Sequence, residues 1–212
     1  VTSVRENGPK NMTMFRLRDA IREGREIGPR MVLCGRPLSI IGGHMGYFGS
    51  AVTGPTEARA MVRQLIKEGA DYIKIVATGG STVTSHPLLP SFNVDELQAI
   101  VDEAHKFGVL TAAHCVSTQG TINSLDAGVD MIIHCVFKEA DGTDVFREDV
   151  AERIVTQGAF VNPTLHVSRA KMWALQERQE RGGLTPEEQR ELDEQRRGFE
   201  TRLEHCGRLI EM

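Results

Sequence analysis

The sequence contains no run of about 18 apolar residues, the length that a membrane-spanning helix needs, so we expect no membrane segment. Neither sign of charge dominates, because 25 basic residues are interleaved with 29 acidic ones and the net charge is -4. Such a chain has no electrostatic footprint for nucleic acid or anionic lipid. We therefore expect a small-molecule substrate as the partner, with no nucleic acid and no membrane.

Features of a secreted protein are also missing. Residues 1–5 provide no basic start, no apolar middle and no small-residue cleavage site of a signal peptide. Because the chain begins with Val rather than Met, its true start is expected to lie upstream. The four cysteines form no CxxC pair and no dense cluster of the kind that a disulfide scaffold uses. Reduced thiols predict a cytoplasmic location.

Two nucleotide-binding motifs, GxGxxG after a strand and GxxxxGK[ST], do not occur. Short apolar runs instead alternate with longer amphipathic stretches, which is typical of repeated βα units around a parallel sheet. Glycines that can end a helix in the left-handed conformation follow the expected helices at Gly28, Gly69, Gly108, Gly128 and Gly158. The expected strands cover residues 1–5, 31–35, 72–77, 109–114, 131–134 and 159–162, and the expected helices cover residues 14–27, 56–67, 94–106, 118–127 and 145–156.

This series favours an α/β fold of the (β/α)8 TIM-barrel type, although an open doubly wound sheet obeys the same local rules. A closed barrel needs eight strands and the sequence offers only six, so we expect either an incomplete barrel or an open sheet. At about residues 170–212 the chain becomes strongly charged and predicts one or two exposed helices, with a capping box at Thr185 and Glu188. We interpret residues 1–212 as one partial barrel domain that carries this helical segment.

A lysine stands at an inward position of the third expected strand. Strand alternation places Lys74 on the face opposite Ile73 and Ile75, so it points into the barrel while they pack under the helices. Burial lowers the pKa of a lysine. A neutral Lys74 could then react with carbon dioxide to form a carbamate, an anionic oxygen ligand for metal ions. The alternative is an ion pair with an acid at the barrel mouth.

The next two expected strands each end on a histidine, His114 and His134, at equivalent positions. A single strand histidine is more often a satisfied core residue than a ligand. Two of them after a strand that carries Lys74 indicate convergence on one point at the carboxyl ends of the strands, where barrel enzymes place their active sites. Imidazole nitrogen and carboxylate-type oxygen suit zinc, and a catalytic zinc activates water. The predicted chemistry is hydrolysis.

Around these residues the sequence resembles the amidohydrolase superfamily, in particular its imidazolonepropionase-like and Xaa-Pro dipeptidase-like branch. The resemblance covers nearly all of residues 1–170 and rests on the ordered lysine and histidines, on Gly42-Gly43-His44 and on Asn162-Pro163-Thr164-Leu165. It implies that Lys74, carboxylated by carbon dioxide, bridges two zinc ions or similar divalent metals. It further implies that His114 and His134 hold the second metal.

Two parts of the family pattern are absent. No HxH motif occurs, and the only Gly-Thr-Asp, Gly142-Thr143-Asp144, lies in a loop after the strand of His134 and not on an eighth strand. We therefore reject Asp144 as the general base. By resemblance, residues 1–5 match the second barrel strand and Asn162 the seventh. The chain is thus expected to be an internal fragment with about strands 2 to 7.

Three further histidines are candidates for substrate binding. His44 lies in a glycine-rich loop, His86 in the long loop after the Lys74 strand, and His166 after Pro163-Thr164. For each, a surface role is the alternative. His105 and His205 lie in helical patterns and are expected at the surface.

The resemblance predicts an enzyme that hydrolyses carbon–nitrogen bonds, in which a metal-bound hydroxide attacks an amide, a cyclic amide or a dipeptide-like substrate. One alternative is ester, lactone or phosphotriester hydrolysis on the same scaffold. The other is a catalytically incomplete fragment with no activity of its own. Oligomeric state is not readable from the sequence, and a homo-oligomer stays open.

Overall fold

The computed structural model describes the backbone of residues 1–212 and every side chain except that of Ser168. Its strands are parallel, as expected from the βα pattern. Strand β1 (Ser3–Arg5) pairs with β2 (Arg30–Val32), and a four-stranded sheet has the order β5 (Ile73–Ile75), β6 (Thr111–Ser117), β7 (Met131–Lys138) and β8 (Phe160–Asn162). Each of the six expected strands therefore has a counterpart.

The two groups of strands are joined where the chain continues beyond β2 and runs beside β5. The Asp71 amide donates to the Leu33 carbonyl at 2.7 Å, and the amides of Leu38 and Val76 donate to the carbonyls of Lys74 and Leu38 at 2.8 Å each. Within the described chain β1 pairs only with β2 and β8 only with β7, so the strands form no closed barrel.

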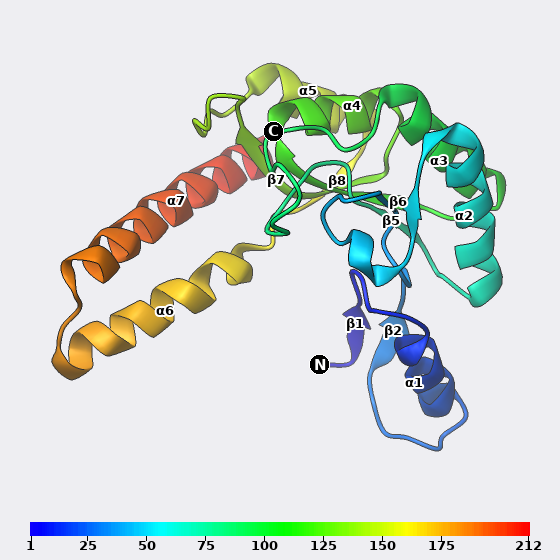
Figure 1. Ribbon diagram of the computed structural model, residues 1–212, viewed down its shortest axis with the longest axis horizontal. Coiled ribbons are helices and arrows are strands. Elements are labelled where there is room, and N and C mark those ends of the chain that lie inside the picture. Colours follow the sequence, from blue (N-terminus) through cyan, green and yellow to red (C-terminus); the bar gives the residue numbers. More distant parts are fainter.

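Five helices connect these strands and cover one side of them (Figure 1). They are α1 (Thr13–Arg22), α2 (Gly54–Glu68), α3 (Val94–Lys106), α4 (Thr118–Asp126) and α5 (Glu148–Gln157). Apolar residues of strands and helices meet in the main core, where Leu65, Ile73, Ile100 and Ile132 are fully buried. Because successive side chains of a strand point to opposite faces, the residues next to these core residues point away from the helices.

The helix ends follow the glycine pattern, with one correction. Gly69 and Gly158 directly follow their helices, Gly108 and Gly128 follow theirs after one intervening residue, and all four have positive φ. The expected helix over residues 14–27 instead ends at Arg22, and the positive φ is at Gly24 and not at Gly28. The periodic pattern around Ile27 is therefore not helical, and its side chain is fully exposed.

Two short strands were not predicted. Strands β3 (Ser39–Ile40) and β4 (Ala51–Val52) form a two-residue parallel pair, with a single 3-10 turn at Gly46–Phe48 between them. Strands of two residues are too short to show an alternation of apolar and polar residues in the sequence. They fix the glycine-rich loop that carries His44.

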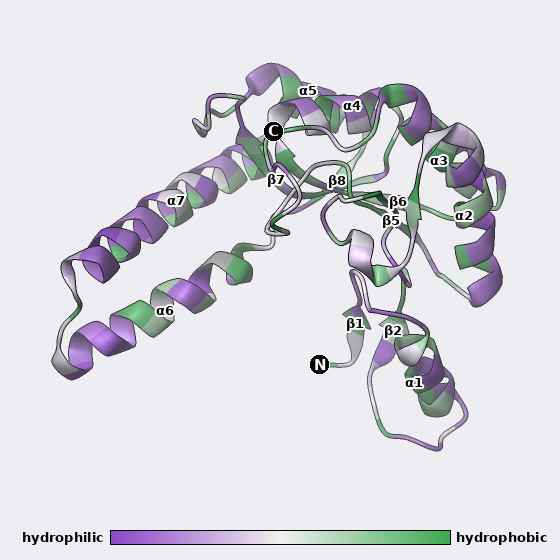
Figure 2. Ribbon diagram, in the orientation of Figure 1, coloured by the Kyte–Doolittle hydropathy of each residue, from purple (hydrophilic) through white to green (hydrophobic). Residues whose placement is uncertain are grey.

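The charged C-terminal segment forms two helices, α6 (Leu165–Gly182) and α7 (Pro186–Glu211), which make a hairpin projecting from the strands (Figure 1). Figure 2 shows that hydrophilic residues dominate its length. Thr185 and Glu188 form the predicted capping box, with Glu188 N donating to Thr185 Oγ1 at 3.2 Å. Between the helices Leu175, Leu192 and Phe199 pack in a separate small core. No helix in the described chain is both long and apolar enough to span a membrane.

His205 is a second correction. It was expected at the surface, but its side chain is buried and packs against the rings of Phe137 and Phe146, at centroid distances of 6.0 and 5.4 Å. This contact docks α7 against the end of β7.

Candidate active site

The inward side chains of the strands open into a cavity of about 520 Å³. Four of the predicted site residues line it, and they come from four different segments of the chain. Lys74 is on β5, His114 on β6, His134 on β7, and His44 on the loop after β3. The rest of the lining consists of Asn7, Met45, Gly80, Ser81, Val116, Ile133, Val136, Thr164, Val167 and Arg202.

Lys74 is buried, with 3% of its surface exposed, while its neighbours Ile73 and Ile75 are completely buried in the core under the helices. Burial lowers the pKa of Lys74 from 10.5 to about 8, and the nearby thiols of Cys34 and Cys115 oppose this shift. At pH 7, one unit below this pKa, about a tenth of the amine is therefore uncharged and nucleophilic.

His114 lies in the middle of a row of three imidazoles. Its ring centroid is 4.6 Å from that of His134 and 4.8 Å from that of His44. Burial, followed by the charge of Lys74, holds the pKa of His114 well below its usual range. The same two causes lower the pKa of His134 to about 4. Both rings are therefore neutral at pH 7, which is the form that binds metal ions.

A neighbouring oxygen orients each of the two strand histidines. His114 Nε2 lies 3.1 Å from the Gly79 carbonyl oxygen, which can only accept, so Nε2 carries the proton and Nδ1 keeps a lone pair. His134 Nδ1 lies 2.5 Å from Thr164 Oγ1. When this nitrogen donates to the hydroxyl, Nε2 of His134 keeps the lone pair. Contacts of this kind set the tautomer and ring orientation of metal-binding histidines.

His44 is held by residues from the loop after β5. Its Nδ1 lies 2.9 Å from Thr82 Oγ1, and Gly80 packs so closely that an added Cβ would lie 2.5 Å from His44 Cδ2. Burial also lowers the pKa of His44. Its imidazole is thus fixed beside His114 in the wall of the cavity.

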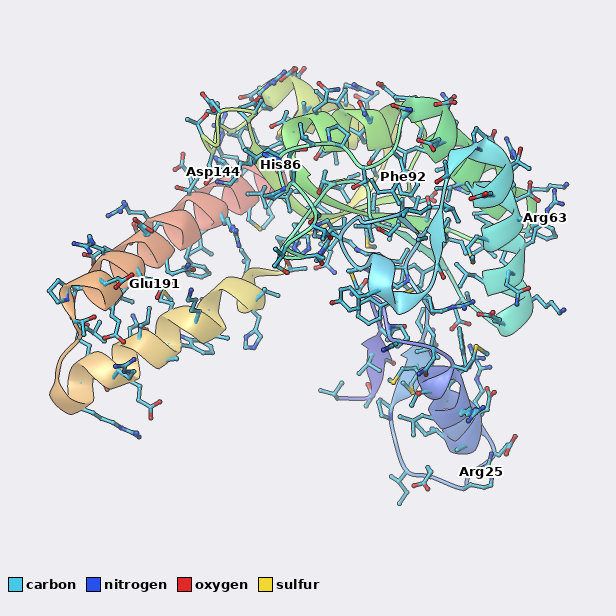
Figure 3. The ribbon with its side chains drawn as sticks, in the orientation of Figure 1. Arg25, Arg63, His86, Phe92, Asp144 and Glu191 are labelled. Carbon is cyan, nitrogen blue, oxygen red and sulfur yellow. The ribbon has the colours of Figure 1, made fainter. Side chains whose placement is uncertain are left out.

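The structure does not bring the other two predicted substrate residues to this cavity. His86 is exposed and lines a separate hollow with Leu89 and Pro90. His166 is exposed on the first turn of α6, where its ring lies 5.7 Å from that of Trp173. Asp144, which the sequence argument rejected as the base, pairs with Lys138 at 3.2 Å and does not line the cavity. Asp144 is labelled in Figure 3.

Sequence reasoning missed several lining residues. Thr164 belongs to the segment 162–165, which was noted only because it resembles the amidohydrolase superfamily. Nothing in the sequence indicated its contact with His134. Arg202 lies in the charged helix α7, which was interpreted as solvent-exposed. Asn7 follows β1, where its amide oxygen accepts from the Tyr72 hydroxyl at 2.8 Å. None of these roles follows from a local sequence pattern.

The thiols are not part of the site. All four cysteines are free, and Cys34, Cys115 and Cys135 are buried. Cys115 Sγ lies 3.4 Å from Ser124 Oγ on α4, on the helix side of β6. Free thiols agree with the expectation of reduced cysteines, while the cytoplasmic location stays a prediction.

The residues fit part of a metal site. Among the described residues, no group of three or more His, Cys, Asp or Glu side chains is arranged to hold a metal ion. His114 and His134 provide two oriented nitrogens of the type that zinc and similar ions prefer. Lys74 becomes an oxygen donor only after carboxylation. The set therefore supplies some of the ligands that such a centre needs.

Comparison with known proteins gives the chain a family. A model of the Amidohydrolase family matches residues 1–208. Ochratoxinase of Aspergillus niger is 26% identical over an alignment of 155 residues, and the match covers 61% of this chain and 32% of that protein. A solved Xaa-Pro dipeptidase with methionine bound in its active site is 27% identical, with a TM-score of 0.78 over 99% of this chain and 52% of its own. A prolidase complexed with N-methylphosphonate-L-proline is 28% identical, with a TM-score of 0.74 over 98% and 52%.

The chain thus spans about half the length of these structures and about a third of the curated relative. The family match includes every residue that lines the cavity. It also contains the parallel strands that carry the lysine and the two strand histidines. On these grounds the chain belongs to the amidohydrolase family.

Proposed function

We propose that the protein containing this chain is a metal-dependent hydrolase of carbon–nitrogen bonds in amides, cyclic amides or dipeptide-like substrates. The observation that carries the proposal is the convergence of Lys74, His114 and His134 from three successive strands on one cavity. On β5 the neighbours of Lys74, Ile73 and Ile75, pack away from the cavity in the main core. Three polar side chains with lowered pKa values in one cavity are typical of a functional site.

The proposed architecture is an incomplete (β/α)8 barrel, in which β1, β2 and β5 to β8 take the places of barrel strands 2 to 7. The helices on one side and the parallel order of the strands support it (Figure 1). In this interpretation residues 1–212 form one domain, and the remaining strands and the remaining catalytic groups lie outside these residues.

We propose that His114 through Nδ1, His134 through Nε2 and carboxylated Lys74 hold the metal, with zinc as the expected ion. A bound divalent ion polarises a carbonyl and lowers the pKa of water, which is the chemistry that amide hydrolysis requires. Gly79 and Thr164 fix the two imidazoles before a metal binds, so little ordering of these side chains is needed on binding.

The role of Lys74 depends on its neutral form. Its amine nitrogen forms a bond to the carbon of carbon dioxide, and one proton leaves to solvent. The product is a carbamate with one negative charge, close to two neutral imidazoles. The pKa of about 8 makes the neutral amine accessible near physiological pH.

Amide hydrolysis is preferred over ester, lactone or phosphotriester hydrolysis because two similar solved proteins are a Xaa-Pro dipeptidase and a prolidase. Within the cavity, His44 is the proposed substrate contact among the three candidates, since it lies beside His114. His86 and His166 are left without a place in this proposal because they do not line the cavity.

The test uses the natural full-length protein and a panel of N-acyl amino acids, dipeptides and matched esters. We expect turnover of amides that a chelator removes and added zinc restores. Lys74→Ala should abolish it, whereas Lys67→Ala, at an exposed lysine of α2, should leave it unchanged. Amide turnover that survives both chelation and Lys74→Ala would refute the proposal, and turnover of esters alone would favour the alternative.

A further inference from the structure

The end of strand β7 has a strained backbone. Six non-glycine residues of the described chain have positive φ, and three of them, His134, Cys135 and Phe137, lie in this strand. Positive φ is unfavourable for a residue with a Cβ, and such residues persist only where the surrounding structure holds them. The first residue of this strained segment, His134, lines the cavity.

The regular sheet pairing ends where the strained segment begins. The pairing of β7 with β8 stops at Ile133, and its pairing with β6 shifts register after His134 and resumes at Lys138. Residues 135–137 therefore have no register partner in either neighbouring strand of the described chain. Contacts from outside the sheet must supply much of the support for their conformation.

Both ends of the hairpin formed by α6 and α7 contact this segment. At the start of α6, Thr164 Oγ1 lies 2.5 Å from His134 Nδ1. Near the end of α7, the buried ring of His205 packs against Phe137 and Phe146. The two contacts thus reach the first and the last residue of the strained segment.

The hairpin has a core of its own. Leu175, Leu192 and Phe199 pack between its helices, and Arg178 forms an ion pair with Glu188 across them. It projects from the strands (Figure 1). A substructure with its own core can detach without unfolding of the rest of the protein. Docking of the hairpin is therefore a separate step from its folding, and it depends on the contacts at its base.

We propose that the docked hairpin positions His134, and that Phe137 and His205 are positioning residues. Docking holds the end of β7 in the strained conformation, in which the His134 ring lies beside that of His114 at the cavity. The metal part of this inference rests on the proposed function, in which zinc binds His134 in this conformation. Docking and zinc binding then favour one another by the same factor, because linkage is reciprocal.

The first experiment measures amide hydrogen exchange in the metal-free, full-length protein. His205→Ala should speed exchange of residues 134–138 by about tenfold, because an undocked hairpin no longer holds them. His205→Phe, which keeps a ring against Phe137, should restore the slow rate. Val62→Ala is the matched control, since Val62 is a fully buried core residue of α2, and it should leave exchange of this segment unchanged.

The second experiment measures the zinc affinity of the same variants by competition with a chromogenic chelator. His205→Ala should weaken zinc binding by about tenfold, whereas His205→Phe and Val62→Ala should bind zinc as the wild type does. In the wild-type protein, added zinc should slow exchange in residues 199–211 of α7.

Unchanged exchange of residues 134–138 in His205→Ala, or the same acceleration in Val62→Ala, would overturn the inference. If His205→Ala does not fold, Arg208→Gln loosens the same contact more mildly, because Arg208 Cζ lies 3.7 Å from the centre of the Phe146 ring. It should also speed exchange of residues 134–138, and no change would again overturn the inference. Faster exchange in these variants with zinc affinity unaffected, or with no zinc bound by the wild type, would leave the hairpin in its role and refute the proposed function instead.

Discussion

Thr164 Oγ1 lies 2.5 Å from His134 Nδ1 and connects the start of α6 to strand β7. Both residues have positive φ, 48° for Thr164 and 74° for His134. This conformation is unfavourable for a side chain with a Cβ, and more so for β-branched threonine. The surrounding structure must therefore hold the pair in place, as the proposed role of His134 as a metal ligand requires.

Thr164→Val should weaken divalent metal binding by about tenfold to a hundredfold, because the hydroxyl that orients His134 is lost while the shape is kept. Thr164→Ser should restore most of the affinity. Zinc affinity is measured by competition with a chromogenic chelator, and thermal unfolding of the metal-free protein checks stability. Thr56→Val, at an exposed threonine of α2, is the control. Unchanged zinc affinity in Thr164→Val would show that the contact has no positioning role.

Lys74 should make stability depend on pH in the alkaline range. Its pKa in the folded protein is about 8, lower than its ordinary value of 10.5, so the unfolded chain holds one more proton between these two values. Stability then increases with pH across this window. The cost of burying the charged amine is fully present below pH 8 and is relieved above it by about 3 kcal/mol.

Lys74→Met removes this titration. The free energy of unfolding of metal-free protein, measured with urea in buffer without carbon dioxide, should therefore differ most from wild type below pH 8 and converge toward pH 10.5. Lys67→Met controls for the loss of an exposed lysine. A difference between wild type and Lys74→Met that stays constant with pH would mean that Lys74 is charged in the folded protein throughout.

The strands and the three central side chains were readable from the sequence for one reason. In a parallel sheet buried under helices, every second strand residue is apolar, so Lys74 between Ile73 and Ile75 stands out. His114 and His134 follow apolar runs in the same way, and the glycine stops locate the ends of the helices between them. The regular alternation of apolar residues along the strands therefore made both the strands and these three side chains predictable.

What could not be predicted depends on contacts between segments far apart in the chain. Thr164 and Arg202 reach the cavity because a helical hairpin docks beside β7, and no local pattern indicates which residue of a charged helix faces inward. The buried position of His205 has the same cause. His86 and His166 lie in segments without a strand period, so nothing in the sequence indicated that they would point elsewhere.

His205 should contribute to the docking of the hairpin. It is buried against two phenylalanine rings, and its Nδ1 has no hydrogen-bond partner among the described residues. His205→Ala would leave a cavity at this contact and should lower the free energy of unfolding by about 2 kcal/mol. Urea unfolding measures the change, and Glu204→Ala at the adjacent exposed residue is the control. A loss no greater than that of the control would show that docking does not depend on this ring.

Residues 1–212 expressed alone should not hydrolyse amides. Under the proposal they supply only Lys74, His114 and His134, and a metal centre that lacks further ligands binds weakly. Their unpaired strand edges should also promote association. Assays with the same amide panel, together with light scattering, check both points. Chelator-sensitive turnover by a monodisperse monomer would contradict both expectations.

A crystal structure of the full-length protein grown with zinc and bicarbonate, with zinc located by anomalous scattering, tests the central claim most directly. The account predicts zinc at about 2.0–2.1 Å from His114 Nδ1 and from His134 Nε2. It also predicts a carbamate on Lys74 with an oxygen bound to zinc. Zinc bound elsewhere, or an unmodified Lys74 beside an occupied site, would contradict it.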